Sequence, residues 1–379
     1  MRILADPNIT QVEEAFSAFG EVVLKPGREW TPALARDAEM WLIRSVTRVD
    51  ERLLDDSRVR FIASATSGVD HVDLDLLARR GVHFASAPGS NARSVAEYVV
   101  AAVLELLAEE RQTAAGLTIA VIGAGQVGSR VALLLEALGM HCLLNDPPLK
   151  AAGGEGRYLD LDAVLNADIV TLHVPLTRTG PHPTWRLLDT ARLARLRSDA
   201  ILINTARGGV IDEAALLRIL AQRPAMRCVI DCWEGEPGID PALLQRATIA
   251  TPHIAGYSFD GKLRATEMIY AAACEHFQRP QEWQPRAGRT APPPMRVDST
   301  GALSTFRSVV RNCYDVTRDS SRLKAMLPLS PAEQAAGFDR LRRDYPVRRE
   351  FAACEGMTAA PGASSAETLR RLGFRLQPA

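Results

Sequence analysis

The chain has 379 residues, of which 47% are hydrophobic and 24% charged, so it can form two or three globular domains with real cores. Its 45 Lys and Arg residues balance 45 Asp and Glu residues, which argues against a nucleic-acid or membrane-surface role. The balance is uneven, because residues 286–379 hold 16 basic and 9 acidic side chains. A solvated or interface surface is the first interpretation of this excess, and an anionic ligand is the second.

The N-terminal part alternates short apolar runs with segments of helical period. Strands are predicted at residues 2–5, 22–24, 40–43, 61–64 and 82–84, and helices at 9–19 and 73–80. This alternation predicts a parallel sheet with helices on its faces. We assign residues 1–92 to this first, substrate-binding lobe.

A long helix predicted at residues 91–110 leads into a second series of the same kind. Its strands are predicted at 117–122, 141–144, 169–173, 200–203, 228–231 and 248–250. We assign residues 93–256 to this second lobe, and expect residues 257–280, with a helix at 261–276, to return to the first. The fold class is therefore α/β, with two Rossmann-like lobes and a cleft between them.

The composition changes after residue 280. Residues 281–297 are rich in proline and indicate a linker, so we assign residues 281–379 to a linker and a small α+β C-terminal domain. Apolar residues in 309–316 and 323–329 need burial, and a two-fold dimer is the commonest way to provide it. We therefore expect a homodimer built through this domain. A separate hypothesis, based only on the basic excess of this segment, is that Arg348 or Arg349 reaches the substrate phosphate of the partner.

The cellular setting follows from the cysteines and the apolar stretches. Six cysteines are scattered without metal-ligand or disulfide spacing, which favours a reducing compartment and no metal site. The longest apolar stretch, residues 95–107, is interrupted by Glu97 and Glu105 and is too short for a membrane span. We expect a cytoplasmic protein.

The strongest motif is G-x-G-x-x-G at Gly123, Gly125 and Gly128, between a predicted strand and a predicted helix at 126–138. The first glycine permits a tight turn, the second lets the backbone approach a pyrophosphate, and the third lets helix pack on strand. The helix N-terminus then offers N–H groups to the phosphates. Asp146 ends the next strand, where a carboxylate binds the ribose hydroxyls and disfavours a 2′-phosphate, so NAD is preferred to NADP.

Three further candidates follow predicted strands: Arg207, Glu236 and His253. In an open parallel sheet, ligands bind at the carboxyl ends of the strands. An Arg can grip a carboxylate in a bidentate fork, and a His held by a Glu can accept a hydroxyl proton. Together they predict the oxidation of a 2-hydroxy acid.

These motifs, in this order, resemble the D-isomer-specific 2-hydroxyacid dehydrogenases. The resemblance includes 44–47 (RSVT), 66–73 (TSGVDHVD), 145–148 (NDPP), 231–237 (DCWEGEP) and 251–257 (TPHIAGY). It continues into 314–316 (YDV) and 338–351, which resemble the dimerisation domain that a narrower group of members carries. For that group it implies NAD-dependent oxidation of 4-phospho-D-erythronate to 2-oxo-3-hydroxy-4-phosphobutanoate, in pyridoxal 5′-phosphate biosynthesis.

The resemblance also implies the site residues. Arg207, Glu236 and His253 are the catalytic set, with His253 as proton acceptor. The implied cofactor contacts are Gly123, Gly125, Gln126, Val127, Gly128, Asp146, Val174, Thr205, Ala206, Arg207, Asp231 and Gly256. The implied substrate contacts are Ser45, Thr66, Tyr257, Arg44 and Gly68. Where the family commonly carries Thr, this chain has Val174, so a hydroxyl contact to the cofactor is missing.

Two alternatives stay open. The chain could be another D-2-hydroxyacid dehydrogenase, such as one that acts on phosphoglycerate. It could also be a non-catalytic protein that senses NAD, although the complete set of Arg207, Glu236 and His253 argues against that.

Overall fold

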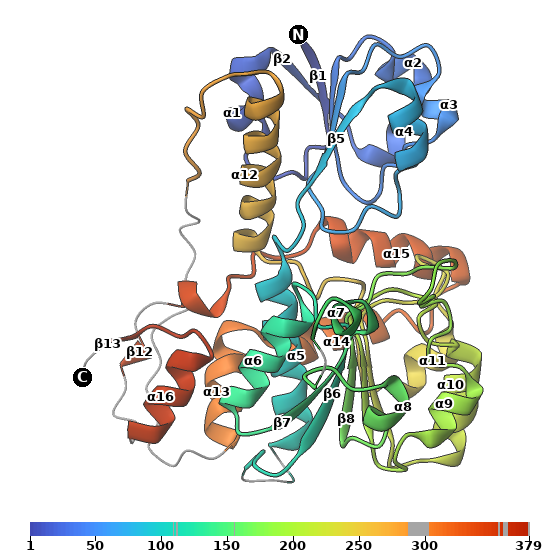
Figure 1. Cartoon of the computed structure of the whole chain (residues 1–379), viewed down its shortest axis with the longest axis vertical. Coiled ribbons are helices and arrows are strands. Elements are labelled where there is room, and N and C mark those ends of the chain that lie inside the picture. Colours follow the sequence, from blue (N-terminus) through green and yellow to red (C-terminus); the bar gives the residue numbers. More distant parts are fainter. Residues whose placement is uncertain are drawn as a thin grey trace. The chain divides into compact units, whose positions relative to one another are not determined.

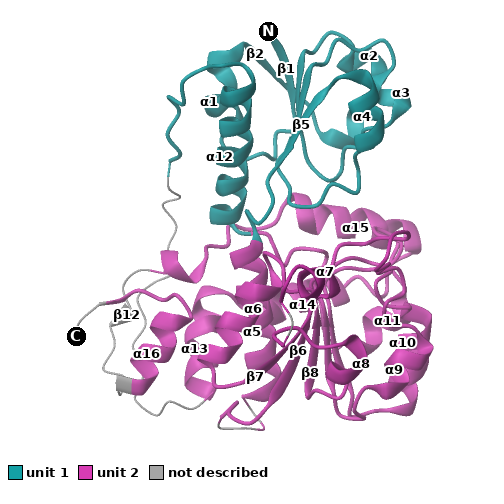
Figure 2. Ribbon diagram, viewed as in Figure 1, with its two compact units in different colours: residues 1–91, 258–289 teal, residues 92–257, 290–379 magenta. Residues whose placement is uncertain are grey.

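The computed structural model describes residues 1–108, 110, 113–154, 156–286, 303–354, 357–358 and 363–377. The chain divides into two compact units, residues 1–91 with 258–289, and residues 92–257 with 290–379 (Figure 2). The C-terminal segment is thus described within the second unit, and its separation as a third domain stays a prediction. Most of the proline-rich segment 281–297 lies outside the described residues.

Unit 1 is built on a five-stranded parallel sheet in the order β2-β1-β3-β4-β5. The strands are β1 (Arg2–Ala5), β2 (Glu21–Leu24), β3 (Met40–Ile43), β4 (Phe61–Ser64) and β5 (His83–Ser86). The helical segments are α1 (Val12–Phe16), η1 (Ser17–Phe19), η2 (Gly27–Glu29), α2 (Pro32–Ala35), α3 (Glu51–Leu54), α4 (Leu74–Arg80) and α12 (Phe259–His276). One apolar cluster of this unit combines Phe16, Phe61 and Tyr270, so α12 supplies part of its core.

Unit 2 contains a six-stranded parallel sheet in the order β11-β10-β9-β8-β6-β7. Its strands are β6 (Thr118–Ile122), β7 (His141–Asn145), β8 (Ile169–Leu172), β9 (Ile201–Asn204), β10 (Arg227–Ile230) and β11 (Ile249–Ala250). Its helices before the C-terminal region are α5 (Ala92–Leu107), α6 (Gly128–Ala137), α7 (Pro147–Ala151), α8 (Leu161–Val164), α9 (Thr190–Arg195), α10 (Glu213–Gln222) and α11 (Pro241–Arg246). The strand order reverses between β6 and β8, and such switch points are where parallel sheets bind ligands.

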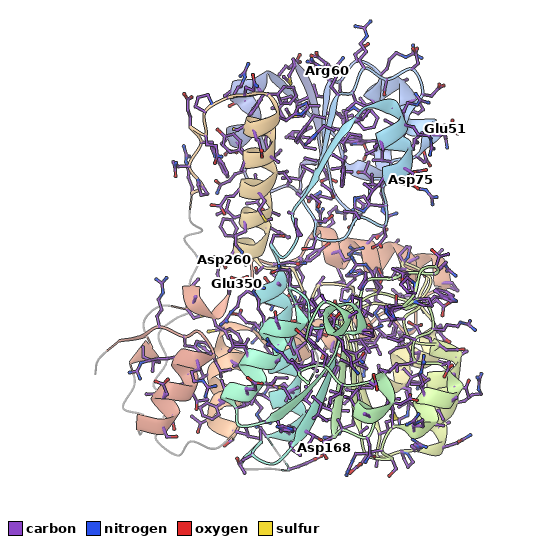
Figure 3. The ribbon with its side chains drawn as sticks, viewed as in Figure 1. Glu51, Arg60, Asp75, Asp168, Asp260 and Glu350 are labelled. Carbon is purple, nitrogen blue, oxygen red and sulfur yellow. The ribbon has the colours of Figure 1, made fainter. Side chains whose placement is uncertain are left out.

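The two ends of this sheet are easily distinguished. Asp168 precedes β8 and accepts hydrogen bonds from the backbone N–H and the hydroxyl of Thr118, at 2.8 Å each, at the amino end of the strands. Figure 3 labels Asp168 at one end of unit 2, and α7, which follows the carboxyl end of β7, lies at the other. The candidate residues after β9, β10 and β11 belong to this second end.

The C-terminal region is mainly helical, whereas the sequence predicted an α+β domain. It contains α13 (Leu303–Cys313), α14 (Val316–Lys324), α15 (Pro331–Arg343), η3 (Phe351–Ala353) and α16 (Ala363–Arg371), with two short strands, β12 (Met357–Thr358) and β13 (Leu376–Gln377). Figure 1 shows these elements, in orange and red, gathered with unit 2.

The apolar residues of this region were expected to need a partner subunit for their burial, and this expectation was wrong. Val309, Val310 and Leu323 are at most 2% exposed within the single chain, so they need no partner subunit for burial. Val309 and Val310 join the cluster that includes α5, and Ser320 on α14 accepts a hydrogen bond of 3.0 Å from the Ala250 N–H of β11. The region therefore covers the edge of the unit 2 sheet.

No helix among the described residues is both long enough and apolar enough to cross a membrane.

Candidate active site

The glycine-rich turn connects β6 to α6 and has the geometry that a close backbone approach requires. Gly123 has a φ of +87°, and a Cβ atom there would lie 2.8 Å from the backbone carbonyl of His173. A Cβ atom at Gly128 would lie 1.9 Å from the Gly123 carbonyl oxygen, whereas one at Gly125 would meet open space. Two glycines thus allow the tight packing and the third leaves the turn open, which fits a dinucleotide pyrophosphate.

Asp146 is positioned against this turn. Its Oδ2 accepts a hydrogen bond of 2.9 Å from the Ala124 N–H, and its Oδ1 caps α7 by accepting one of 3.1 Å from the Leu149 N–H. Both bonds hold the carboxylate at the end of β7, beside the glycine-rich turn. This is the position at which the sequence places a ribose-binding acid.

His253 and Glu236 form a hydrogen-bonded pair, with Nδ1 of the imidazole 2.8 Å from Oε2 of the carboxylate. The other carboxylate oxygen accepts a hydrogen bond of 2.8 Å from the Trp233 N–H. Burial alone would raise the pKa of Glu236, but the His253 interactions, the Trp233 bond and the charge of Arg342 together lower it. The arrangement is that of a general base whose imidazole is oriented by an ionised carboxylate.

Asp231 organises the loop that carries His253. Its carboxylate accepts bonds from the Thr251 hydroxyl at 2.6 Å and from the N–H groups of Ile254 and Ala255 at 2.7 and 3.0 Å. This network supports His253 in the left-handed region, at a φ of +56°, which is uncommon for a residue with a side chain. Asp231 is 1% exposed, so the role that its contacts show is to shape this loop, and a contact with NAD stays a prediction.

Arg207 lies in the loop after β9, with Nη1 donating a hydrogen bond of 2.7 Å to the Ala206 carbonyl. Asn204 shapes this loop, since its side-chain nitrogen donates to the carbonyls of Arg207 and Cys232 at 3.1 and 3.0 Å. It thereby joins the loops after β9 and β10. The hydroxyl oxygen of Thr205 lies 3.3 Å from Nδ1 of His173. Burial lowers the pKa of His173 to about 3, so this histidine is neutral.

The remaining predicted contacts divide between the units. Tyr257 and Gly256 end the loop after β11 in unit 2, and Val174 follows β8, next to the glycine-rich turn. In unit 1, Arg44 and Ser45 follow β3, while Thr66 and Gly68 follow the neighbouring strand β4. These four residues therefore share one edge of the unit 1 sheet, and the Thr66 hydroxyl donates a hydrogen bond of 3.0 Å to the Gly68 carbonyl.

Arg348 has a different task from the predicted one. It is 5% exposed, and its Nη1 and Nη2 donate to the carbonyls of Ala255 and Ser94 at 3.0 and 2.6 Å. Its guanidinium also lies 3.8 Å from the centre of the Tyr314 ring. Because these contacts lie within its own unit, Arg348 cannot reach a substrate held by a partner subunit.

Sequence reasoning missed three residues near the pair. Asn204 has a detectable signal, since it directly ends a predicted strand, as the chosen candidates do. No sequence pattern identifies Glu213, but in the structure it is 6% exposed and accepts a hydrogen bond of 2.7 Å from the Glu234 N–H. Arg342 has no sequence signal, because only the packing of α15 brings it to Tyr257.

Comparison with protein families gives two matches along the chain. Residues 96–255 match the model of the D-isomer specific 2-hydroxyacid dehydrogenase, NAD binding domain. Residues 291–373 match a domain of unknown function, DUF3410.

Among curated proteins, the chain is 45% identical to the erythronate-4-phosphate dehydrogenase of Marinobacter nauticus, over 100% of both chains. It is 42% identical to that of Chromohalobacter salexigens, over 100% of this chain and 99% of the relative.

Solved structures resemble about three quarters of the chain. A D-lactate dehydrogenase of Aquifex aeolicus, complexed with NAD and lactic acid, has a TM-score of 0.62 and 26% identity, over 73% of this chain and 96% of its own. A cofactor-bound 3-phosphoglycerate dehydrogenase of Entamoeba histolytica, with a TM-score of 0.63 and 22% identity, covers 76% of this chain and 99% of its own, and shows the shared fold.

Proposed function

The chain belongs to the erythronate-4-phosphate dehydrogenases, within the D-isomer-specific 2-hydroxyacid dehydrogenases, and from this membership we propose its reaction. It oxidises 4-phospho-D-erythronate to 2-oxo-3-hydroxy-4-phosphobutanoate with NAD, a step of pyridoxal 5′-phosphate biosynthesis. The observation that carries the proposal is the 2.8 Å contact between His253 and Glu236, in a unit that has the NAD-binding fold. We also propose a cytoplasmic location, on the composition of the chain.

NAD would be held at the glycine-rich turn. The N–H groups of Gln126 and Val127 suit the pyrophosphate, since they lie where the turn enters α6, and Asp146 suits the ribose hydroxyls. When bound, NAD supplies a hydride acceptor. The other cofactor contacts, from Val174 to Gly256, follow from family resemblance.

The protein side of the reaction is a proton transfer. Because Nδ1 of His253 is bonded to Glu236, Nε2 is the atom that accepts the proton of the substrate 2-hydroxyl. Glu236 keeps the ring oriented and stabilises the imidazolium that forms. Arg207 binds the substrate carboxylate as a bidentate fork and so presents the hydroxyl-bearing carbon.

Tyr257 in unit 2 and Ser45, Thr66, Arg44 and Gly68 in unit 1 remain proposed substrate contacts. They follow from family resemblance and from their positions at the carboxyl ends of strands. The positive charge of Arg44 suits the substrate phosphate.

We also propose that the protein is a homodimer formed through the C-terminal region. Support comes from the resemblance of residues 314–316 and 338–351 to a dimerisation domain, and from the general preference of soluble chains for two-fold dimers. Light scattering of the full chain should give twice the monomer mass, and a monomer at micromolar concentration would refute the dimer.

The reaction is tested by a comparison of substrates. NADH formation is measured with 4-phospho-D-erythronate, 3-phospho-D-glycerate and D-lactate, with candidate 2-oxo acids present to reoxidise the cofactor. The proposal predicts the highest kcat/KM for 4-phospho-D-erythronate. A higher value for 3-phospho-D-glycerate would assign the chain to another substrate, and no substrate-dependent NADH at all would favour an NAD-sensing protein.

A further inference from the structure

Arg342 brings a positive charge from the C-terminal region to the candidate active site. It lies at the end of α15, and its guanidinium carbon is 5.8 Å from the centre of the Tyr257 ring. Its positive charge also acts on the Glu236 carboxylate. Arg342 thus contacts one side chain of the site, Tyr257, and its charge acts on a second, Glu236, within unit 2.

Arg342 is partly buried, and its hydrogen bonds leave one buried nitrogen of the guanidinium without a partner in the part of the chain that the structure describes. Its Nε is buried and has no hydrogen-bond partner among the described residues, and such groups in folded proteins call for an explanation. Arg348 provides a contrast, because its Nε is also without a partner while both of its Nη atoms donate to backbone carbonyls. Arg348 therefore has a structural role, whereas Arg342 is directed at side chains of the site.

The helix that carries Arg342 is firmly placed. α15 begins with a capping box, in which Ser330 and Glu333 bond to each other's backbone N–H. A Cβ atom at Gly337 would lie 2.4 Å from the sulfur of Met326, and Phe338 is 1% exposed, so the helix packs closely on its own unit. Figure 1 shows α15 at the same end of unit 2 as α7, which is the carboxyl end of the sheet.

Tyr345, which follows α15 in the chain, also contacts Tyr257. The ring of Tyr345 meets the Tyr257 ring edge-on, with their centres 5.8 Å apart and an interplanar angle of 83°. The Tyr345 hydroxyl donates a hydrogen bond of 2.6 Å to Asp319 and is thereby fixed. Tyr345 and Arg342 together confine Tyr257, which lies in the same loop as His253.

We propose that Arg342 is a positioning residue of the active site, which holds the Tyr257 side chain and places a positive charge beside the His253–Glu236 pair. The titratable or charged side chains that interact with Glu236 include His253 from the loop after β11, Cys232 from the loop after β10, Glu213 from α10 and Arg342 from α15. The DUF3410 region thereby takes part in the reaction of its own subunit. The inference rests on the proposed function for the role of the pair.

The test compares full-length Arg342→Met, Arg342→Lys and a matched control, Arg343→Met. Arg343 is the next residue of α15, but its side chain is 63% exposed and pairs with the adjacent Asp344. The pH profile of kcat/KM falls at acid pH when the His253–Glu236 pair takes up a proton. Without the positive charge, proton uptake is easier, so Arg342→Met should move this fall upward by about half a pH unit or more and lower kcat about tenfold.

Arg342→Lys should keep the wild-type position of the acid fall, since the charge remains, and Arg343→Met should match the wild type throughout. A wild-type profile and kcat in Arg342→Met would overturn the proposal. A rise in KM alone would also overturn it, because it would make Arg342 a substrate contact rather than a positioning residue. Arg342→Gln replaces Arg342→Met where the latter does not fold.

A second readout separates this inference from the proposed function. Proton uptake by the pair is followed by NMR of the chain with isotope-labelled histidine, without substrate. The pH midpoint of this proton uptake should move to higher pH in Arg342→Met and stay in place in Arg343→Met. Both results are expected even if 4-phospho-D-erythronate is not turned over. An unmoved midpoint would refute the role of Arg342, and wild-type inactivity with a moved midpoint would refute only the proposed reaction.

Discussion

Replacement of Glu213 by Gln should stabilise the protein, and only above acid pH. Burial raises the pKa of Glu213 from 4.5 to about 8, with smaller contributions from Glu234 and Glu236. Below pH 4.5 this carboxyl is protonated in both the folded and the unfolded chain, so it adds no pH dependence to the free energy of unfolding. As the pH rises toward 8, the unfolded chain ionises first, and the folded state loses relative stability.

The size of this destabilisation follows from the shift in the pKa of Glu213. Each pKa unit corresponds to about 1.4 kcal/mol, so the penalty approaches about 5 kcal/mol above pH 8 as an upper bound. Gln keeps the oxygen that accepts the Glu234 N–H but does not ionise, and the penalty disappears. At roughly 2 °C per kcal/mol for a unit of this size, the melting temperature should rise by up to about 10 °C at pH 8.

Melting temperatures of the wild type and the Glu213→Gln variant are measured from pH 4.5 to 9 by circular dichroism. The matched control is Glu136→Gln, at an exposed position of α6. The difference between Glu213→Gln and wild type should be small at pH 4.5 and grow to a plateau above pH 8, whereas the control difference stays flat. Parallel curves for Glu213→Gln and wild type would refute the burial of a protonated carboxyl beside the catalytic pair.

Three further predictions concern the site and the C-terminal region. His253→Ala should lower kcat by about 10²–10⁴-fold with little change in the Kd for NAD from fluorescence titration, and near-normal turnover would contradict the assigned proton transfer. Asp146→Ala should weaken NAD binding and reduce the preference for NAD over NADP, whereas equal use of both cofactors by the wild type would show that Asp146 does not discriminate. Truncation after residue 286 removes the α13 and α14 side chains packed on unit 2, so it should give aggregates in light scattering, and a stable, soluble truncated chain would contradict that packing.

The sheets were the most predictable part of the fold. β3 and β4 have the predicted bounds, because uninterrupted apolar runs such as Met40–Ile43 are the sequence signature of strands buried on both faces. The helix predicted at 9–19 was less accurate, since α1 begins at Val12. Gln11 has a φ of +57°, a backbone conformation that residue pattern does not reveal and that prevents an earlier start.

The site was predictable as far as strand ends could indicate it. Glu236 and His253 follow β10 and β11, and the structure brings them into contact. The need of backbone N–H groups for an acceptor was not predictable. Asp231, which the resemblance assigns to the cofactor, also accepts three hydrogen bonds from the loop after β11. Arg342 and Arg348 depend on how a distant segment folds back, which leaves no local pattern, and for that reason Arg342 was missed and Arg348 was given the wrong task.

The most direct test of the proposed reaction follows the hydrogen on C2 of the substrate. 4-Phospho-D-erythronate carrying deuterium at C2 is mixed with NAD and the full-length chain, and the NADH formed is examined by mass spectrometry and NMR. The account predicts deuterium on the nicotinamide ring with the wild type and almost none with His253→Ala over the same time. Unlabelled NADH from the wild type, or equal labelling by the His253→Ala variant, would contradict it.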